Sequence, residues 1–442
     1  MKKIIVLGAG RSAGELITYL LQYAENKDIE IWVADTNVAA AEQKINAHPK
    51  GMALALNVND AAARNILIRQ ATIVVSLLPA DLHYLVAEEC LHEKKHLITA
   101  SYISEGIERL HEAVQKNGLI FMNEIGLDPG IDHISAMKII AEIKNKGGLI
   151  TSFKSWCGGL VAPESDTNAW HYKISWNPRN VVLAGKATAQ YRADKVNKFI
   201  PSHRIFNEIW QIELAEYGSF EGYANRDSLS YLPLYGLEDC ATLLRGTLRY
   251  QGYCNAWAAL ALLGYTDDSY QIKNTKGMSL SQLTLSLLPY STGDATAQFI
   301  SFLQINNILS AKEQLLSLGL LSDEIIEFEY ASPAEILQHI ITQKWKMQPE
   351  DRDLVVMKHE FEYSLENKKY ALNASLYLKG DDAEHTAMSK TVGLPAAIYC
   401  TMILENKINQ RGVLRPLHSE CFSILTDLEK LGISFIETTK QI

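Results

Sequence analysis

The sequence predicts an α/β protein, with a doubly wound parallel sheet at the start of the chain and a mixed α/β region with a helical subdomain after it. Three observations support this prediction. Short β-branched apolar runs alternate with amphipathic stretches between residues 2 and 123. A glycine-rich turn follows the first of these runs, and an aspartate follows the second. Beyond about residue 148 the strict alternation ends and longer amphipathic stretches appear.

The first apolar run leads into a Gly-x-Gly-x-x-Ala turn formed by Gly8, Gly10 and Ala13. Gly8 permits the tight turn, Gly10 lets a pyrophosphate approach the backbone, and the small Ala13 lets the following helix pack on the strand. The helix N-terminus then faces the anion, with Arg11 and Ser12 inside the turn. A glycine turn alone is weak evidence, but the strand before it and the helix after it favour a dinucleotide-binding site.

The second apolar run, residues 29–34, ends at Asp35. In this position a carboxylate accepts hydrogen bonds from both ribose hydroxyls of NAD and repels the 2′-phosphate of NADP. We therefore expect NAD as the cofactor. The neighbouring Thr36 and Asn37 could tolerate some phosphate, which keeps NADP as the alternative.

Four more strands alternate with helices in the rest of this region. We expect helices at residues 38–47, 60–70, 82–92 and 104–117, and strands at residues 53–58, 71–78, 96–100 and 119–123. Six parallel strands with helices between them form a Rossmann sheet, whose ligands bind at the carboxyl ends of the strands. The cofactor-binding residues expected at these ends are Asn57, Ser76, Leu77, Leu78, Ser101, Leu127, Asp128 and Pro129.

The later part of the chain has a different pattern. We expect strands at residues 151–157 and 171–176, helices at 239–262 and 297–318, and a hairpin of residues 355–363 and 370–378 around a turn at 366–368. An apolar helix at residues 391–408 is expected to dock back on the first domain. The predicted domains are a Rossmann domain at residues 1–130, completed by residues 391–442, and a substrate-binding and dimerisation region at residues 131–390.

The composition favours a cytoplasmic protein with more than one domain. A chain of 442 residues has room for two or three cores, and its net charge of −9 disfavours nucleic acid as a partner. The six cysteines lack metal-binding spacing, which predicts reduced thiols and no structural metal. The apolar N-terminal run is too short for a signal peptide, and we find no run long enough to span a bilayer. We also expect a homodimer.

Several long motifs indicate a family. The tract MNEIGLDPGIDH occupies residues 122–133, where the nicotinamide ring is expected. It is accompanied by WCGGLVAPE at residues 156–164, NRDS at 225–228, RGTLRYQG at 245–252, TVGLP at 391–395 and RGVL at 411–414. Together these motifs, spread over nearly the whole chain, resemble those of the glutamate-forming saccharopine dehydrogenases, also called saccharopine reductases.

The resemblance implies a fold and a reaction. Fungal members of this family have a Rossmann domain, a mixed α/β domain and a helical domain. They couple 2-aminoadipate 6-semialdehyde with glutamate through an imine that a nicotinamide cofactor reduces. The reverse reaction oxidises saccharopine, and both directions follow the same microscopic path.

By resemblance, the substrate-binding residues are Ser101, Tyr102, Asp128, Trp176, Arg226, Thr247, Leu248 and Arg249. The first three border the substrate and the nicotinamide ring, Trp176 lines the pocket, and the arginines hold carboxylates. The planar guanidinium of Arg226 or Arg249 offers a bidentate fork for such a group. Because the two arginines stand in separate polar tracts, we expect them to converge on one anionic ligand, with an interdomain ion pair as the alternative.

Imine formation and hydrolysis need a group that gives and takes a proton, and the candidate catalytic residues are Asp128, Tyr102 and Cys157. Asp128 also suits a turn before proline, and a buried Cys157 would pack as a small apolar group. His83 and His133 lie at expected helix starts, where histidine more often caps or packs than catalyses.

The sequence departs from the family pattern at a few positions. Asp35 stands near the point where fungal relatives have an arginine and favour NADP, Asn57 replaces an aspartate, Val161 replaces a proline, and residues 380–385 lack a glycine-rich segment. Two other functions compete with saccharopine oxidation. A carboxyspermidine or carboxynorspermidine dehydrogenase would favour acids over arginines in its pocket. A catalytically silent NAD-binding protein would share the fold alone.

Overall fold

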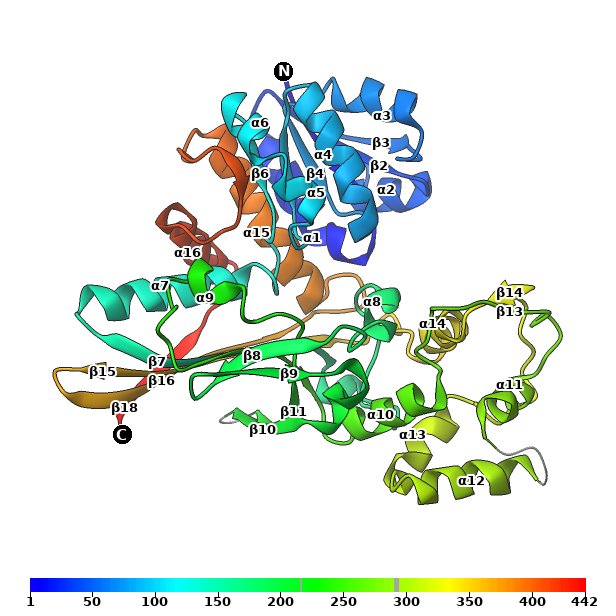
Figure 1. Cartoon of the computed structure of the whole chain (residues 1–442). Helices are drawn as coiled ribbons and strands as arrows, with labels where there is room; N and C mark the ends of the chain where they lie inside the picture. Colours follow the sequence, from blue (N-terminus) through cyan, green and yellow to red (C-terminus); the bar gives the residue numbers. More distant parts are fainter. Residues whose placement is uncertain (215–216, 290–293) are drawn as a thin grey trace. The chain divides into compact units, whose positions relative to one another are not determined.

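The computed structural model describes residues 1–214, 217–289 and 294–442 (Figure 1). These residues form two compact units, each assembled from two separate stretches of the chain. Unit 1 comprises Met1–Leu149 and Leu376–Ile436, and unit 2 comprises Ile150–Ser375 and Glu437–Ile442. Unit 1 extends beyond the expected limit at residue 130, because helix α7 (Ile131–Asn145) packs against helix α16 (Phe422–Lys430) of the same unit.

Unit 1 is built on a seven-stranded parallel sheet in the order β17-β6-β5-β4-β1-β2-β3. Its strands are β1 (Lys2–Leu7), β2 (Ile29–Asp35), β3 (Gly51–Ala55), β4 (Ile73–Ser76), β5 (His96–Thr99), β6 (Ile120–Met122) and β17 (Gly412–Leu414). The six predicted strands are present, and the Rossmann sheet is confirmed. The seventh strand, β17, joins the sheet beside β6, and its three residues are too few to give a periodic pattern in the sequence.

The strands at the centre of this sheet are buried on both faces. Residues 4–7 of β1 and 73–75 of β4 are continuous apolar runs with no exposed surface, as a parallel sheet covered by helices requires. The helices of unit 1 are α1 (Gly14–Ala24), α2 (Val38–Ile45), α3 (Ala61–Ile68), α4 (His83–His92), α5 (Glu105–Glu108), α6 (His111–Lys116), α7, α15 (Ala387–Leu404) and α16. The single helix expected at residues 104–117 is thus divided into α5 and α6.

Helix α15 corresponds to the apolar helix expected at residues 391–408, and it packs against α1 within unit 1. Gly393 permits this contact, because a Cβ atom there would lie 3.0 Å from the backbone nitrogen of Leu16. Of the helices in the described residues, α15 alone is long and apolar enough to cross a membrane, whereas we expected no such run. Since 83% of its most apolar window is buried inside the protein, its packing on α1 and α16 explains that apolar character.

Unit 2 is built on a mixed nine-stranded sheet, whose main path has the order β10-β11-β12-β7-β15-β16-β18, with β8 attached to β12 and β9 to β8. Its strands are β7 (Leu149–Val161), β8 (Ala189–Ala193), β9 (Val196–Ile200), β10 (Ile209–Leu214), β11 (Gly218–Ala224), β12 (Thr242–Arg249), β15 (Asp353–Leu365), β16 (Lys368–Lys379) and β18 (Ile436–Gln441). Strands β12 and β7 are parallel, and β11 is antiparallel to both of its neighbours. The expected hairpin is β15 and β16, joined through Glu366 and Asn367, which both have positive φ.

Three expected elements of unit 2 differ in the structure. Residues 171–176 form no strand, and an isolated bridge joins Ile174 to Lys346. The segment 239–262 begins with strand β12, held between β11 and β7, before helix α10 (Tyr253–Leu263). The segment 297–318 contains two helices, α12 (Ala295–Ile305) and α13 (Lys312–Ser317), because Asn307 has a left-handed φ of 58° that ends the first helix. Further elements are α8 (Pro178–Val182), α9 (Tyr231–Leu234), β13 (Ile272–Lys273), α11 (Leu280–Leu287), β14 (Tyr330–Ala331) and α14 (Pro333–Lys344).

Candidate functional site

The turn after β1 has the geometry that a dinucleotide requires. Gly8 has a φ of 101°, and its N–H donates to the carbonyl oxygen of Ala34 on β2 over 2.9 Å. A Cβ atom on Gly8 would lie 3.0 Å from the carbonyl oxygen of Leu77. A Cβ atom on Gly10, by contrast, would meet nothing within 4 Å. Gly8 therefore permits the turn, and the backbone at Gly10 is open to the approach of an anion ahead of helix α1.

Asp35 ends β2 and lies half-buried beside the glycine turn. Its Oδ2 accepts a hydrogen bond from the Ala9 N–H over 2.7 Å, and its Oδ1 accepts one from the Asn37 N–H over 2.8 Å. A carboxylate oxygen can accept more than one hydrogen bond, so both oxygens can still accept from hydroxyl groups of a ribose. The residues present therefore fit the nucleotide half of a nicotinamide cofactor.

The other residues predicted to bind the cofactor differ in exposure. Arg11, Thr36 and Asn57 are exposed, whereas Ser12, Leu77 and Leu78 are partly buried. Asn57 follows β3, and its Oδ1 accepts from the Asn59 N–H over 3.1 Å. This bond shapes the turn between β3 and α3, so the side chain of Asn57 has a structural role.

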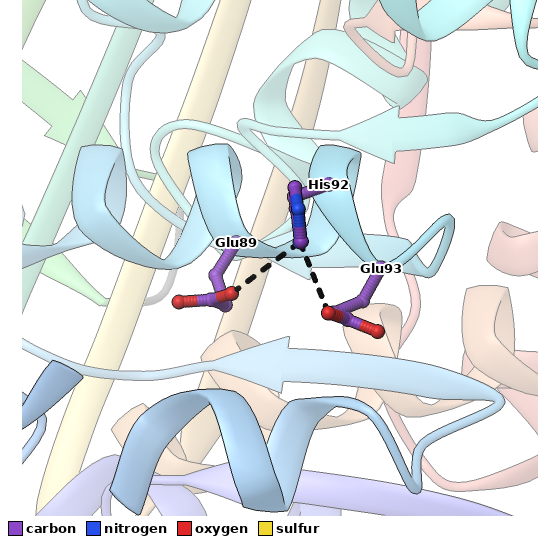
Figure 2. A group of neighbouring side chains, drawn as sticks. All are labelled: Glu89, His92 and Glu93. Atoms are coloured by element: carbon purple, nitrogen blue, oxygen red, sulfur yellow. Dashed lines mark hydrogen bonds and ion pairs between the residues drawn. The ribbon is translucent and has the colours of Figure 1, made fainter. Parts of the chain in front are cut away.

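One group of side chains in the described residues has the spacing of a metal site: Glu89, His92 and Glu93, at the end of α4 (Figure 2). The Asn65 side-chain amide donates to Glu89 over 2.7 Å and to Glu93 over 3.0 Å. The guanidinium of Arg64 lies 3.5 Å from the other oxygen of Glu89. Because these donors already engage both carboxylates, we interpret the group as a polar contact between α3 and α4 and assign no metal to it.

His83 joins the carboxyl ends of β4 and β5. Its Nδ1 lies 2.9 Å from Oγ of Ser76, and its Nε2 lies 2.8 Å from Oγ of Ser101. The side chain is buried, and burial lowers the pKa of His83 to about 4, so the ring is neutral at neutral pH. The sequence favoured a capping or packing role for this histidine, whereas the structure places it in a polar bridge between two predicted ligand-binding residues.

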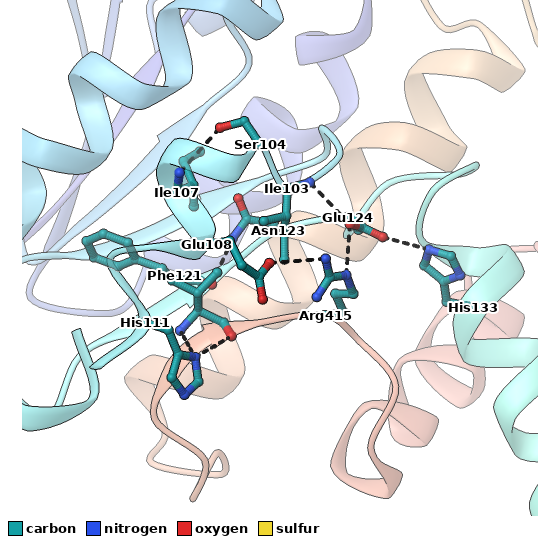
Figure 3. A network of polar contacts seen from close by, with 11 residues as sticks. Ile103, Ser104, Ile107, Glu108, His111, Phe121, Asn123, Glu124, His133 and Arg415 are labelled. Carbon is teal, nitrogen blue, oxygen red and sulfur yellow. Dashed lines mark hydrogen bonds and ion pairs between the residues drawn. The ribbon is translucent and has the colours of Figure 1, made fainter. Parts of the chain in front are cut away.

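Glu124 is the centre of a buried network at the end of β6 (Figure 3). Its Oε1 accepts from the Ile103 N–H over 3.1 Å and from Nε of Arg415 over 3.0 Å. Its Oε2 accepts from Nε2 of His133 over 3.1 Å. Burial opposes the ionisation of Glu124, but the hydrogen bond from His133 and the charge of Arg415 prevail, so the pKa of Glu124 lies below its ordinary value.

Asp128 and Tyr102 meet on the same edge of the sheet. The Tyr102 hydroxyl donates to Oδ1 of Asp128 over 3.1 Å, and both residues are half-buried. Asp128 stands on a closed loop, in which the Gly126 N–H donates to the Pro129 carbonyl oxygen over 2.9 Å. A Cβ atom on Gly130 would lie 2.0 Å from the carbonyl oxygen of Gly126, so glycine is required there. The loop therefore holds the carboxylate of Asp128 in a fixed place, beside the buried Leu127.

In unit 2, the sheet brings Cys157 and Thr247 together. Strands β7 and β12 pair in a register that sets Thr247 opposite Cys157. The next residue of β7 is Gly158, where a Cβ atom would lie 2.8 Å from the carbonyl oxygen of Leu248. Cys157 is only 6% exposed and Leu248 is fully buried. Of these three predicted residues, Thr247 therefore has the most exposed side chain.

Arg249 lies in a tyrosine cage, formed by the rings of Tyr172, Tyr223 and Tyr253. The guanidinium carbon of Arg249 lies 5.3, 5.8 and 5.2 Å from these three ring centres, respectively. Its Nη1 donates to the Leu248 carbonyl oxygen over 2.8 Å, and its side chain is also hydrogen-bonded to Tyr253, while its buried Nε has no hydrogen-bond partner among the described residues. Within the described ranges, no carboxylate lies at ion-pair distance from Arg249. The alternative of an ion pair at Arg249 is therefore not supported.

The tyrosine cage also connects two other predicted substrate residues. Nε1 of Trp176 donates to the hydroxyl of Tyr172 over 2.8 Å, and Thr247 is hydrogen-bonded to Tyr223. Burial raises the pKa of the Tyr172 and Tyr223 phenols, so both stay protonated at neutral pH. Unit 2 thus gathers Trp176, Thr247 and Arg249 around one set of aromatic rings.

Arg226 lies elsewhere in unit 2. It is exposed, directly after β11, with a φ of 44°. The register of β11 and β12 sets Glu221 opposite Arg249, and Arg226 lies five residues (226 − 221) beyond Glu221. The β11–β12 pairing ends at Ala224, opposite Gly246, so Arg226 lies beyond one end of this pairing and Arg249 lies at its other end. We expected the arginines to converge on one anionic ligand, and this convergence stays a prediction.

Two family models match the chain. One, described as "Saccharopine dehydrogenase NADP binding domain", matches residues 4–122. The other, described as "Saccharopine dehydrogenase C-terminal domain", matches residues 126–433. The two matches together cover both units.

Individual relatives agree with these matches. The saccharopine dehydrogenase [NADP(+), L-glutamate-forming] of Schizosaccharomyces pombe is 32% identical, over 99% of this chain and 99% of its own. The apo structure of saccharopine dehydrogenase (L-Glu forming) from Saccharomyces cerevisiae covers 100% of both chains with a TM-score of 0.87 and 31% identity. The alpha-aminoadipic semialdehyde synthase of Arabidopsis thaliana is 32% identical over 98% of this chain, but over 44% of its own length. The chain thus spans about half the length of such synthases.

The sequence did not reveal the groups that hold the predicted residues in place. Glu124 lies inside the MNEIGLDPGIDH tract, so its position in that motif was an available signal. Arg415 comes from a part of the chain 291 residues away, and nothing in the sequence links it to Glu124. The three tyrosines of the cage come from separate elements, and no spacing pattern connects them.

Proposed function

Because the chain belongs to the saccharopine dehydrogenase family, we propose that it interconverts saccharopine with glutamate and 2-aminoadipate 6-semialdehyde by hydride transfer to or from a nicotinamide cofactor. The observation that carries this proposal is the hydrogen bond between Tyr102 and Asp128, at the same edge of the parallel sheet as the glycine turn. Relatives matched over 99% of their own length are named glutamate-forming saccharopine dehydrogenases, which supports it further.

The residues of unit 1 can bind the cofactor and move a proton. When bound, the nicotinamide cofactor takes or supplies the hydride. The open backbone at Gly10 suits its pyrophosphate, and the carboxylate of Asp35 suits its ribose. Asp128 is half-buried and hydrogen-bonded to Tyr102, so it can take a proton from the water that adds to the imine carbon. Cys157 is more deeply buried, which makes it the weaker of the candidates for this role.

The residues of unit 2 suit the carboxylates of saccharopine. Among the described residues, the buried guanidinium of Arg249 has no carboxylate partner, and a buried charge without a counterion is costly in free energy. An anionic ligand would offset this cost. Arg226 offers a second, exposed guanidinium beyond the opposite end of the β11–β12 pairing, which suits a substrate with three carboxylates. A carboxynorspermidine-type substrate carries additional amines, which two arginines would repel.

A direct assay tests the proposal. Purified protein is mixed with saccharopine and either NAD or NADP, with carboxynorspermidine in parallel, and the absorbance of the reduced cofactor is followed. We expect reduced cofactor with saccharopine and none with carboxynorspermidine. Asp128→Asn should lower kcat by roughly 100-fold while the cofactor Kd, measured by tryptophan fluorescence, changes less than about twofold. No reduction with saccharopine and either cofactor contradicts the proposal, and turnover of carboxynorspermidine alone favours a polyamine enzyme.

We propose that NAD is the preferred cofactor. The family model and the fungal relatives carry NADP in their names, whereas Asp35 puts a negative charge where a 2′-phosphate would bind. The ratio of kcat/KM for NAD to that for NADP should exceed about 10, and Asp35→Ser should lower it. A higher kcat/KM with NADP would overturn the cofactor preference and leave the family unaffected.

We also propose a cytoplasmic homodimer with a small-molecule substrate and no nucleic-acid partner. All six cysteines are buried free thiols, which suits a reducing compartment. Sedimentation equilibrium tests the dimer, and a mass of about 49.4 kDa for the particle in solution would contradict it.

A further inference from the structure

His83 connects two strand ends of unit 1 through both of its ring nitrogens. It is the first residue of α4 and is 2% exposed. Ser76, at the end of β4, faces Nδ1, and Ser101, two residues after the end of β5, faces Nε2. Thr99 lies 3.3 Å from the same Nε2 and accepts the N–H of Ser101 over 3.2 Å. The imidazole therefore spans the gap between the two adjacent strand ends, within one hydrogen-bonded group.

The chemistry of the ring suits this position. A neutral imidazole has one donor nitrogen and one acceptor nitrogen, and serine hydroxyls rotate to match either. The contacts of 2.9 and 2.8 Å are both of normal hydrogen-bond length. A hydroxyl group offers one donor and two acceptor positions, so Ser101 keeps further hydrogen-bonding capacity beyond its contact with His83. Ser101 is half-buried, in contrast to the buried Ser76, so its hydroxyl is the one that a ligand can reach.

We propose that His83 is a positioning residue, which fixes the direction of the Ser101 hydroxyl for the substrate. The inference rests on the proposed function, because that function sets Ser101 beside saccharopine. A free serine side chain rotates among three staggered positions, and the contact with Nε2 selects one of them. An apolar side chain of similar size would fill the same space but would leave the hydroxyl free to rotate. The neighbouring Tyr102, which bonds to Asp128, follows Ser101 directly in the chain.

Two substitutions separate positioning from packing. In His83→Gln the side-chain amide can reach the place of Nε2 and keep the contact with Ser101, whereas in His83→Asn it can reach the place of Nδ1 and keep only Ser76. We expect His83→Asn to lower kcat/KM for saccharopine by roughly 10- to 100-fold, and His83→Gln by less than about fivefold. The Tm should fall by a similar amount in both variants, because each loses the contact with one of the two serines.

A matched control and a double-mutant cycle complete the kinetic test. His96, at the opposite end of β5, accepts the Ile120 N–H through Nδ1 over 3.1 Å, and His96→Asn should leave kcat/KM within about twofold. If His83 acts through Ser101, His83→Asn should cause little further loss in a Ser101→Ala background. Equal losses in the two His83 variants, or a full additional loss in the Ser101→Ala background, would overturn the inference.

A measurement without turnover distinguishes this inference from the proposed function. Histidine labelled with ¹⁵N reports each ring nitrogen separately by NMR. Ser101→Ala should shift the Nε2 resonance of His83 and leave its Nδ1 resonance nearly unchanged. An unchanged Nε2 resonance would contradict the positioning of Ser101, whether or not the protein oxidises saccharopine. A further outcome is that the unmodified protein fails to oxidise saccharopine while Ser101→Ala still gives the expected Nε2 shift. That combination would contradict the proposed function and would still support the contact between His83 and Ser101.

Discussion

Two buried charges, Glu124 at the strand ends of unit 1 and Arg249 in the tyrosine cage of unit 2, are held in different ways. Glu124 accepts from a backbone N–H, a histidine and an arginine, so both of its oxygens are engaged. Arg249 donates to one carbonyl group, is hydrogen-bonded to the Tyr253 side chain and faces three aromatic rings, and its buried Nε is unpaired among the described residues. The protein itself supplies hydrogen-bond partners for both oxygens of Glu124. One nitrogen of Arg249, by contrast, is left without a partner among the described residues.

This difference distinguishes a residue that supports the fold from a residue that binds a ligand. Removing one partner from a satisfied buried network leaves the others unpaired, which is costly. Removing a buried charge that lacks a counterion also removes its desolvation cost, so the stability of the fold changes little. We therefore expect substitutions at Glu124 to affect folding, and substitutions at Arg249 to affect substrate binding.

The largest effect is expected for Glu124→Ala. This substitution leaves the buried His133 and the half-buried Arg415 without their shared acceptor, and it releases the Ile103 N–H. The free energy of unfolding should fall by about 3 kcal/mol, measured by urea denaturation. The turnover of saccharopine should fall as well, because Ile103 adjoins Tyr102.

Glu108→Gln is the matched control for this prediction. Glu108 contacts the same Arg415 over 3.2 Å, but its side chain is 53% exposed. An exposed ion pair contributes little, so the free energy of unfolding should change by less than about 0.5 kcal/mol. Equal destabilisation by the two substitutions would mean that Arg415, and not the buried network, determines the effect.

The second effect is a loss of stability in mild acid caused by His83. Its pKa is about 4 in the folded protein, below the ordinary value of 6.5, because burial disfavours the charged ring and outweighs the opposing charge of Asp81. Between these values the unfolded chain binds a proton that the folded protein does not, so the free energy of unfolding falls as the pH falls. Between pH 6.5 and 5 this contribution reaches about 2 kcal/mol.

Urea denaturation of the unmodified protein and of His83→Gln at pH 7, 6 and 5 measures this contribution. The fall with pH should be smaller in the variant, because glutamine does not titrate. Glu124 does not affect this comparison. Because its pKa is lowered, its contribution to the free energy of unfolding is lost only at more acidic pH. Parallel curves for the two proteins would show that His83 is not the group responsible.

The same two regions explain how far the sequence could predict the structure. The strands of unit 1 were predictable because their buried apolar runs end in glycine or polar residues, and the glycine turn marks their ligand-binding edge. The segment that forms strand β12 was interpreted as part of a helix. Its buried apolar residues Leu243, Leu244 and Leu248 fit the period of a helix as well as that of a strand. The hydrogen bonds of His83 and the tyrosine cage around Arg249 depend on contacts between separate elements of the fold. No local pattern in the sequence could predict these contacts.

A smaller effect is expected at the glycine turn, where the two glycines should behave differently. Gly8→Ala puts a side chain at a φ of 101° and 3.0 Å from the Leu77 carbonyl oxygen, so the free energy of unfolding should fall by about 1 to 3 kcal/mol. Gly10 has a φ of −68° and open space around it, so Gly10→Ala should leave stability unchanged. The added methyl group should instead weaken the binding of the cofactor, measured by tryptophan fluorescence. Equal stability of the two variants would contradict the strain at Gly8.

We expect the smallest effect on stability for Arg249→Met. This substitution is also the most direct test of the comparison between Glu124 and Arg249. Methionine keeps a similar volume among the three tyrosines and removes a charge that has no counterion among the described residues, so the free energy of unfolding should change by less than about 1 kcal/mol. The KM for saccharopine should rise by roughly tenfold or more, because a charge-assisted hydrogen bond to a carboxylate is lost. Arg226→Met is the control, since Arg226 is exposed and its loss should leave stability unchanged. A large loss of stability in Arg249→Met with an unchanged KM would mean that this arginine supports the fold of unit 2, as Glu124 does in unit 1.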